Sequence, residues 1–550
     1  MKIGHWLAGA AGLAYAAKRG RDRLRLSRAK HKGLIGHVRM AKRAAGLIPF
    51  YDFDRHAFFN ADGAPQAVAD RREDGFGKLA TLYQQRFAKS AALSAEMRDS
   101  IPDIAFTSTY RVPFQFSRVV RENLPSGNFY VSSSGLKLTD PDGNEFYDLT
   151  GSYGVNLLGT EHYKQMIADG AATVADLGPV LGGLHPVVAD NVRRLKAISG
   201  LDAVSFHMSG TEAVMQAVRL AQYHTGKKKI VRFAGAYHGW WGEVQPGIGN
   251  PVPAENTYTL GDMSERTLEV LRTRKNIACV LVNPLQAMHP NSNAPGDSAL
   301  VDSSRRSYVD RHAYSEWLRT LRQVCTEAGI VLIVDEVFTG FRLAPRGACE
   351  YFGITPDIVT YGKTLGGGLP VGVVCGRADL MRRYKPEKPA DICFARGTFN
   401  SHPYVMGAMD QFLKWHASEE AAKAYEGVDA RWNARAEMLN DQLEAKGLSP
   451  RVANLGTVWT TMYTKPSRYN WMFQYYLRAH GLALGWTGTG RFIFNLAFED
   501  VDFAEIAGRF LAAAREFETD GWTWSPDGAT DNALRRQVMR EMIDKRLGRG

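Results

Sequence analysis

The chain has 550 residues, more than one compact domain usually holds, and its 45% apolar and 11% aromatic content is that of a globular protein. The net charge of +11 lies wholly in residues 1–50, which hold twelve Lys or Arg and one acid, so the neutral remainder predicts no nucleic-acid partner. Five cysteines without a C-x-x-C pair argue against a disulfide framework or a bound metal and favour a cytoplasmic location.

Residues 1–105 are predicted to form a basic helical extension. The first stretch, "MKIGHWLAGAAGLAYAAKRG", is too short to cross a bilayer, and only Lys2 precedes its apolar run, unlike the start of a signal peptide. Apolar positions at helical spacing among dense Lys and Arg are typical of a helix on the cytoplasmic face of a membrane. Two other interpretations of residues 1–50 stay open: an arm packed on the body or on a partner subunit, and a contact with an acidic carrier protein.

From residue 106 the pattern alternates between strands and helices. Residues 135–150 predict a β-hairpin with Pro141, Asp142 and Gly143 in its turn. Short apolar runs separated mostly by helices follow: "KIVRF" (229–233), "IACVLVNP" (277–284), "IVLIVDEV" (330–337), "DIVTYG" (357–362) and "VGVVCG" (371–376). Such runs are typical of a mainly parallel sheet that is buried on both faces.

We therefore predict an α/β protein in four parts. The extension over 1–105 precedes 106–170, the N-terminal segment of a small α+β domain. Residues 171–420 form the large domain around the mainly parallel sheet, and residues 421–550 complete the small domain.

Two motifs of the large domain have the residues of a ligand site. In "MSGTEA" (208–213), the amides of Ser209, Gly210 and Thr211 open a helix after a strand, where they either bind an anion such as phosphate or form an ordinary cap. In "AYHGWWG" (236–242), Tyr237 beside His238 forms either a flat wall against a ring or part of a core cluster.

Asp335 ends the apolar run of residues 330–334, at the end of a buried strand where ligands bind in open α/β sheets. A buried carboxylate needs a partner, and a protonated ring nitrogen or a magnesium ion would serve.

Lys363 stands in "VTYGKTLGGGLP" (359–370) before a block of glycines. A P-loop is excluded, because Asp357 occupies the position of its first glycine and the segment continues into a strand instead of a helix. Burial between two strands lowers the pKa of a lysine and makes its amine a nucleophile. A lysine, an aspartate for a ring nitrogen and a phosphate site are together what pyridoxal phosphate requires.

These motifs resemble the class III aminotransferases of fold type I, and most closely their glutamate-1-semialdehyde 2,1-aminomutase branch. The resemblance covers roughly residues 110–550 and is carried by "MSGTEAVMQAVRLA", "YHGWWG", "DEVFTGFRLAPRGACEYFGITPDIVTYGKTLGGGLPVG" and "RGTFNSHP". It implies that Lys363 binds pyridoxal 5'-phosphate as a Schiff base and shuttles a proton. It also implies that Asp335 pairs with the protonated pyridine nitrogen.

The resemblance assigns further contacts by position. Val337 and Tyr237 would cover the two faces of the ring, with His238 beside them, and the segment from Ser209 to Thr211 would hold the phosphate. Thr398 in "RGTF" would reach the phosphate of a neighbouring subunit, which implies a homodimer.

Positions on the substrate side are less specific. Ser152 and Tyr153 in "LTGSYG" match a segment that faces the substrate in the aminomutase branch. Arg396 and Arg491 are candidates for binding a substrate carboxylate, and structural ion pairing is an equal alternative for either.

The chain departs from the family near the substrate. Met208 stands where the family usually has Asn, and Asn283 precedes Pro284 where Glu-Pro is frequent. The early Pro-Gly-Gly segment of the aminomutase is absent. These differences favour an aminotransferase that moves an amino group from an amino acid or amine to an aldehyde, ketone or keto acid, lipid- or carrier-linked acceptors included. An intramolecular aminomutase and a membrane-binding scaffold on an inactive fold are the alternatives.

Overall fold

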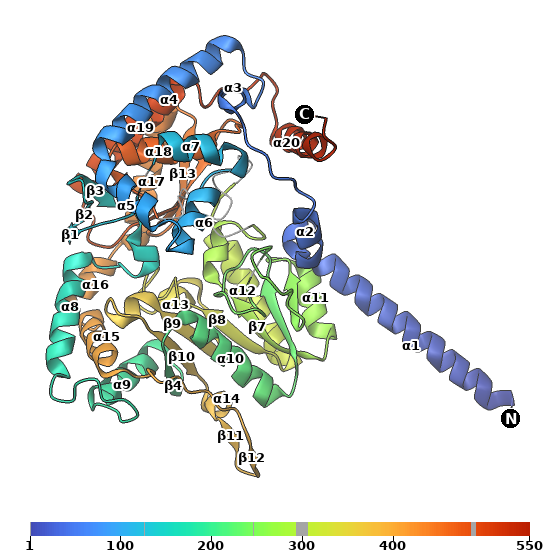
Figure 1. The fold of residues 1–550 in the computed structure, drawn as a ribbon. Coiled ribbons are helices and arrows are strands. Elements are labelled where there is room, and N and C mark those ends of the chain that lie inside the picture. The colour runs from blue at the N-terminus through green and yellow to red at the C-terminus, as the bar shows by residue number, and fades with distance from the viewer. Residues whose placement is uncertain (1, 126, 246, 293–305, 486–490, 550) are drawn as a thin grey trace.

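The computed structural model shows a layered body from which the first helix projects (Figure 1). The structure describes residues 2–125, 127–245, 247–292, 306–485 and 491–549. No helix in these ranges is both long enough and apolar enough to span a membrane.

The central sheet has seven strands, and six of them run in the same direction. Their order is β4 (Ala203–His207), β10 (Gly372–Gly376), β9 (Ile358–Gly362), β8 (Val331–Asp335), β7 (Ile277–Val282), β5 (Lys229–Phe233) and β6 (Thr257–Leu260). Only β10 is reversed, and it pairs antiparallel with both β4 and β9. The predicted α/β fold with a mainly parallel sheet is thereby confirmed.

Helices cover both faces of this sheet. The principal ones are α9 (Val187–Ser199), α10 (Gly210–Thr225), α11 (Glu265–Thr273), α12 (Arg311–Ala328), α13 (Gly347–Phe352) and α15 (Pro403–His416). Along β7, Val280 and Val282 pack in the cluster that contains α11 and α12, whereas Cys279 and Leu281 pack in the cluster of α10. Because successive strand residues point to opposite faces, a continuous apolar run fills both clusters.

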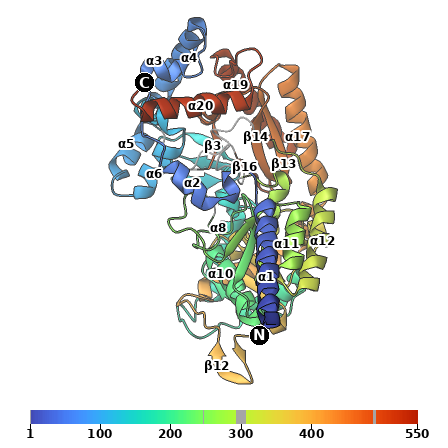
Figure 2. The same cartoon turned by 90° about the vertical axis from the view of Figure 1, so that its right-hand side faces the viewer.

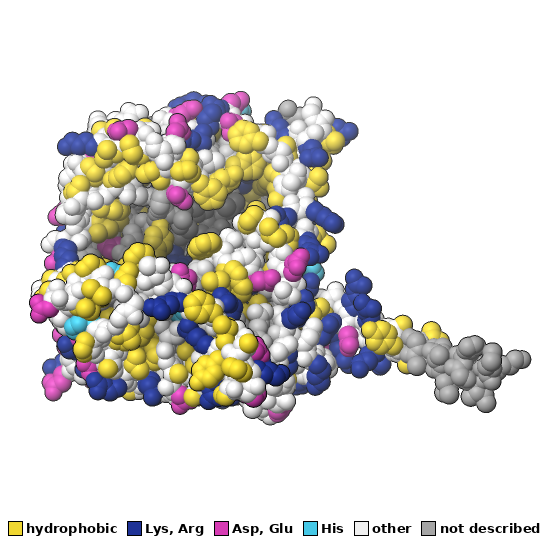
Figure 3. All heavy atoms as spheres, turned by 60° about the horizontal axis from the view of Figure 1, so that its bottom comes forward, with side chains coloured by type: hydrophobic (Ala, Val, Ile, Leu, Met, Phe, Trp, Pro, Cys, Tyr) yellow, Lys and Arg dark blue, Asp and Glu magenta, His cyan; other side chains and the backbone are white. Residues whose placement is uncertain are grey.

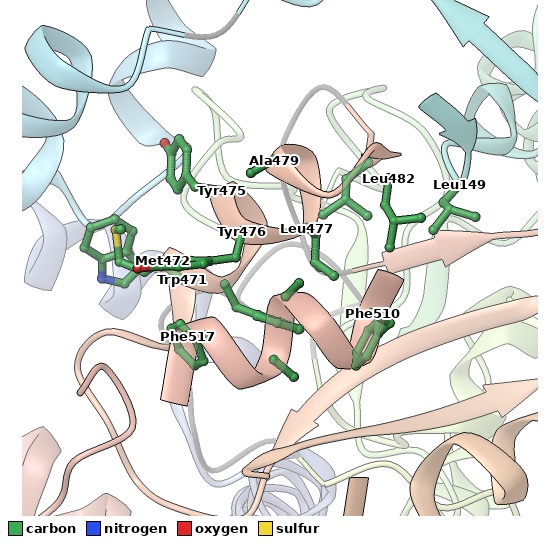
Figure 4. Packing of buried hydrophobic residues seen from close by; sticks show 14 of the residues in the cluster. Leu149, Trp471, Met472, Tyr475, Tyr476, Leu477, Ala479, Leu482, Phe510 and Phe517 are labelled. Atoms are coloured by element: carbon green, nitrogen blue, oxygen red, sulfur yellow. The ribbon is translucent and has the colours of Figure 1, made fainter. Parts of the chain in front are cut away.

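A second layer combines segments that are far apart in the sequence. The predicted hairpin is present as β2 (Lys137–Thr139) and β3 (Glu145–Asp148), and β15 (Leu482–Ala483) extends its sheet beside β3. A further antiparallel sheet contains β13 (Pro450–Leu455), β14 (Val458–Tyr463) and β16 (Arg491–Ile493). Against these sheets lie α17 (Val428–Ala445), α18 (Phe473–Ala479) and α19 (Asp500–Thr519). Figure 4 shows Phe510 and Phe517 of α19 in the same hydrophobic cluster as Tyr476 and Leu477 of α18, and the ring centres of Phe517 and Tyr476 lie 5.8 Å apart.

Several of the helices before the hairpin contribute to this same core. The helices between residues 55 and 123 are α3 (Arg55–Asn60), α4 (Gln66–Arg86), α5 (Ala88–Met97), α6 (Pro102–Tyr110) and α7 (Ser117–Asn123). Phe58, Phe76 and Tyr83 are buried in one hydrophobic cluster with Trp471 and Trp522. The predicted boundary at residue 105 falls inside α6, and the division at 105, 170 and 420 stays a prediction.

The basic arm contains α1 (Lys2–Ala29) and α2 (Val38–Ala45). The end of α1 lies beside α11, where Arg25 forms an ion pair of 2.7 Å with Glu269 and the Gly261 N–H donates to the Ala29 carbonyl (Figure 2). Leu13 is 75% exposed on the projecting part. The side chains of residues 1–12, which include the first of the apolar positions predicted at helical spacing, lie outside the described part. The arm is thus held to the body by its second half.

Candidate active site

A cavity of about 820 Å³ lies where the parallel strands end. Four predicted motifs follow these strands: Ser209 comes after β4, Tyr237 after β5, Asp335 at the end of β8 and Lys363 after β9. All four residues line the cavity, because parallel strands bring their carboxyl ends to one edge of a sheet. The residues that were predicted from separate motifs therefore meet in one place.

Asp335 is held in a fixed orientation at this edge. Its Oδ2 lies 2.8 Å from Nδ1 of His238, and its Oδ1 accepts hydrogen bonds from the Val337 N–H at 3.1 Å and from Thr360 Oγ1 at 3.2 Å. Asp335 and His238 are both almost fully buried. Burial of a carboxylate is costly unless it is paired, so this network keeps a negative charge directed at the cavity.

Lys363 has the properties of a nucleophilic amine. Its pKa is lowered to about 8, mainly by burial; the charge of Asp335 opposes this decrease, and the nearby Arg491 and Arg342 contribute to it. Its backbone has φ +47°, a left-handed conformation that costs a residue with a side chain on the order of 1 kcal/mol. Lys363 lines the cavity, where its Nζ lies 5.8 Å from the centre of the Phe338 ring.

The start of α10 provides an anion site. Ser209 Oγ accepts a hydrogen bond from the Glu212 N–H at 3.3 Å, and a Glu212 carboxylate oxygen accepts one from the Met208 N–H at 2.9 Å. This reciprocal cap leaves the first amides, including those of Gly210 and Thr211, for a ligand. A Cβ at Gly210 would lie 2.5 Å from the Val337 side chain, so glycine allows the helix to approach the turn after β8 closely.

These residues fit pyridoxal phosphate in chemistry and arrangement. The cavity contains an amine, a carboxylate held by His238, a helix N-terminus and, in Tyr237 and Val337, the two side chains expected against a ring. His238 Nε2 is buried without a hydrogen-bond partner in the described part of the chain. Among the described residues, no group of three or more His, Cys, Asp or Glu could hold a metal ion.

The four residues predicted to face the substrate do not all lie in the same place. Tyr153 and Arg491 line the cavity, whereas Ser152 lines a neighbouring one. Arg396 and Thr398 are exposed and outside both. Sequence reasoning missed Thr360 and Phe338; the second was visible in "VDEVFTGFR", where it directly follows Val337.

The neighbouring cavity has about 690 Å³ and meets the first at Thr150 and Tyr153, which line both. Helices α5, α6 and α7 supply much of its lining, which contains three arginines and, among the described residues, no acid. Ser152 and Tyr153 at the junction have φ +45° and +55°, so the connecting turn is strained. Figure 3 shows a hollowed face of the molecule with hydrophobic side chains gathered around the hollow.

The fold and the cavity define an α/β enzyme of the type that carries pyridoxal phosphate on a lysine. Comparison with known families makes the assignment specific: the chain belongs to the class III aminotransferases, whose family model matches residues 119–243 and 309–513. The predicted family, enzyme class and cofactor are confirmed.

Individual relatives agree with this assignment. A glutamate-1-semialdehyde 2,1-aminomutase of Geotalea daltonii is 32% identical over 404 residues, which is 70% of this chain and 86% of the relative. A transaminase solved with pyridoxal phosphate bound is 27% identical with a TM-score of 0.63, over 79% of this chain and 99% of that one. A glutamate-1-semialdehyde aminomutase from Pseudomonas aeruginosa PAO1 has the same fold, with a TM-score of 0.64 at 19% identity, over 81% and 98% of the two chains.

Proposed function

We propose that the protein transfers an amino group from an amino acid or amine donor to a separate aldehyde, ketone or keto acid, with Lys363 as the residue that binds the cofactor. The observation that carries this proposal is the meeting of Lys363, Asp335 and the start of α10 in one cavity. Retention of all three argues against an inactive scaffold.

Bound pyridoxal phosphate supplies an aldehyde for the donor's amino group and a ring that stabilises negative charge at the substrate α-carbon. The anionic Asp335 keeps a proton on the ring nitrogen, and His238 positions that carboxylate. Lys363 takes the proton from the α-carbon of the donor and returns one to the acceptor. Its lowered pKa supplies the uncharged amine that this step needs. The amides of Gly210 and Thr211 anchor the phosphate.

The neighbouring cavity supports an acceptor with an apolar portion that ends in an acidic group. Ile101, Ile104 and Leu124 provide apolar lining, and Arg98 and Arg121 provide positive charge. Neither arginine has a hydrogen bond or an ion pair within the described ranges. Burial and then the charge of Arg98 lower the pKa of Arg121, and the carboxylates of Asp52 and Glu122 offset only part of this decrease.

An intramolecular aminomutase is the second candidate, because the relative from Geotalea daltonii has that name. The two functions differ in one measurement. A transferase given only a donor converts its cofactor stably to the amine form and releases a keto product. A mutase given its substrate alone returns an isomer. We expect donor-only conversion, detected by absorbance and by mass spectrometry of the product, and no visible absorption band in Lys363→Ala after reconstitution. Isomer formation without any acceptor would instead establish the mutase.

The active enzyme is proposed to be a cytoplasmic homodimer with shared sites. Thr398 is exposed and outside the cavity of its own subunit, as a residue directed at a neighbour would be. Mixing two inactive variants, Thr398→Asp and Lys363→Ala, would then form hybrids with one intact site. Random exchange should restore about a quarter of wild-type activity, because half of the dimers are hybrids with one working site each. Failure of exchanged hybrids to regain activity would contradict shared sites.

The basic arm is proposed to contact a membrane surface or an acidic carrier, and the exposed apolar side chains of Leu13, Leu34, Leu47 and Phe50 support the first. Deletion of residues 2–20, which precede the part of the arm that packs on the body, should weaken sedimentation with anionic vesicles. Unchanged sedimentation would remove the membrane from the proposal.

A further inference from the structure

A third cavity, of about 480 Å³, lies between the basic arm and the edge of the central sheet. One wall comes from the end of α1 and from α2, and the other comes from β5, β6 and the segment that connects them. It shares no lining residue with the active-site cavity. Lys42 fixes α2 at its rim by donating hydrogen bonds to the carbonyls of Asn250 at 2.6 Å and Pro251 at 2.5 Å.

Arg232 of β5 lies at the buried side of this cavity. Its side chain is 2% exposed, yet Nε and Nη1 have no hydrogen-bond partner in the described residues. Burial lowers its pKa to about 10, and no carboxylate counteracts this effect. A buried guanidinium without an acceptor is strongly unfavourable, so its presence calls for an anion that enters from the cavity.

Three further cations line the same space. Lys30 is half-buried, and burial followed by the charge of Arg39 lowers its pKa. Arg39 and Arg43 stand at the exposed rim. Within the described ranges, none of the three forms a side-chain hydrogen bond or an ion pair. The only acid among the described lining residues is Glu255, which is exposed. Four cations without partners around one cavity form an electrostatic site for an anion of more than one charge.

We infer that this cavity binds a phosphate monoester, with Arg232 beneath the phosphate and Lys30, Arg39 and Arg43 around it. Guanidinium groups match phosphate oxygens in pairs, and a dianion would neutralise more of the cluster than a carboxylate. The phosphate could belong to a free metabolite or to a lipid headgroup such as that of phosphatidic acid. Leu34 and Met40, exposed on the arm beside the cavity, are compatible with the lipid.

The test uses the full-length enzyme loaded with pyridoxal phosphate, so that the active-site anion site is filled. Inorganic phosphate is titrated by calorimetry at constant ionic strength, with chloride as the balancing salt. The variant Lys30→Gln/Arg39→Gln/Arg43→Gln removes three cations from the cavity. The control Lys18→Gln/Arg19→Gln/Arg23→Gln removes three exposed cations from α1. We expect saturable binding that is roughly tenfold or more weaker in the cavity variant and unchanged in the control.

Arg232→Met provides an independent readout, because it removes the buried charge while keeping an apolar stem. We expect this variant to melt above the wild type in phosphate-free buffer and to gain nothing from added phosphate. Binding to vesicles shows whether the phosphate belongs to a lipid or to a free metabolite. Vesicles of phosphatidylcholine with phosphatidic acid are compared with vesicles that contain phosphatidylglycerol at matched charge. If the protein prefers phosphatidic acid and loses this preference in the cavity variant, the ligand is a lipid. If the protein binds phosphate but shows no such preference, the ligand is a free phosphate ester. No saturable phosphate binding, together with equal loss of vesicle binding in both triple variants, would overturn the site.

Discussion

Asp335 and His238 form a buried pair, with Oδ2 of the carboxylate 2.8 Å from Nδ1 of the imidazole. The two residues lie 97 positions apart, one after β5 and the other at the end of β8, and the sheet brings them together. The carboxylate that we propose to face the cofactor is therefore oriented by a residue from the motif that supplies Tyr237. Under the proposed function, this contact would couple cofactor binding to the chemistry of the ring.

Replacing His238 with Phe removes the polar group beside Asp335 Oδ2. We expect the cofactor to bind tenfold or more weakly, because a hydrogen bond to a charged group contributes about 1.5–3 kcal/mol. We also expect the visible absorption band of the loaded protein to shift. Titration with pyridoxal phosphate followed by absorbance measures both. His238→Gln keeps an amide donor and should recover part of the affinity. Equal affinity in wild type and His238→Phe would mean that Val337 and Thr360 orient Asp335 without help.

The lowered pKa of Lys363 predicts how cofactor attachment depends on pH. With a pKa of about 8, roughly one amine in ten is uncharged at pH 7, whereas at the ordinary value of 10.5 almost none would be. The rate at which the cofactor-free protein becomes coloured after mixing with pyridoxal phosphate should rise with pH and level off above about pH 8. A rate that continues to rise to pH 10 would show an ordinary lysine.

The same shift affects the stability of the cofactor-free protein. The pKa is lowered on folding, so between about 8 and 10.5 the unfolded chain binds more protons at this lysine than the folded one. The contribution of Lys363 to the free energy of unfolding therefore becomes more favourable as the pH rises through this window. Lys363→Met lacks this pH-dependent contribution, so at low pH its free energy of unfolding should exceed that of the wild type. This difference, measured in urea titrations, should shrink as the pH rises from about 8 to 10.5.

The meeting of the candidate site residues in one cavity could be predicted from the sequence because each lies at or just after the end of a strand in one sheet. The apolar runs before Asp335 and Lys363 identify strands, and the small residues after β4 identify a helix start. Once strands are parallel, their carboxyl ends must share an edge. Local patterns therefore contain most of the information about this part of the site.

Contacts that depend on packing between distant segments were not predictable in this way. In the sequence, Thr360 is indistinguishable from any other residue of its strand, and only the structure shows that its hydroxyl donates a hydrogen bond to Asp335. The neighbouring cavity requires α5 to α7 to pack beside Tyr475 and Leu484, more than 350 residues later. Helical periodicity identifies an apolar face but does not identify its distant partner.

Arg342 is predicted to hold the two layers of the body together. Its buried guanidinium donates to the carbonyls of Gly154, Asn156 and Phe494 and to Thr457 Oγ1, at 2.8 to 3.2 Å. Arg342→Met leaves these acceptors without a donor and should lower the free energy of unfolding by about 3 kcal/mol, measured in urea. Loss of the charge should also raise the pKa of Lys363 and move the attachment profile to higher pH. Arg540→Met, an exposed arginine on α20 (Asp531–Arg546), is the control and should change neither.

Arg98 and Arg121 are predicted to select acceptors by their distal group. The test compares aldehydes of one chain length that end in a methyl or in a carboxylate, together with a short aldehyde that ends before the neighbouring cavity. In Arg98→Gln/Arg121→Gln, kcat/KM for the carboxylate-ended chain should fall about tenfold or more, because a charge-assisted contact is lost. The values for the methyl-ended chain and the short aldehyde should stay within about twofold.

The control for these substrates is Arg71→Gln/Arg515→Gln, which removes two exposed arginines outside the cavity. An equal decrease in both double variants would indicate general attraction of anions, since surface charge acts on every acidic substrate alike. If kcat/KM decreased equally for all three aldehydes in Arg98→Gln/Arg121→Gln but not in the control, the substitutions would be acting on the fold or on cofactor binding. Only a decrease in kcat/KM that is confined to the carboxylate-ended aldehyde assigns the neighbouring cavity to the acceptor. A long substrate would reach that cavity by passing Thr150 and Tyr153, which line both cavities.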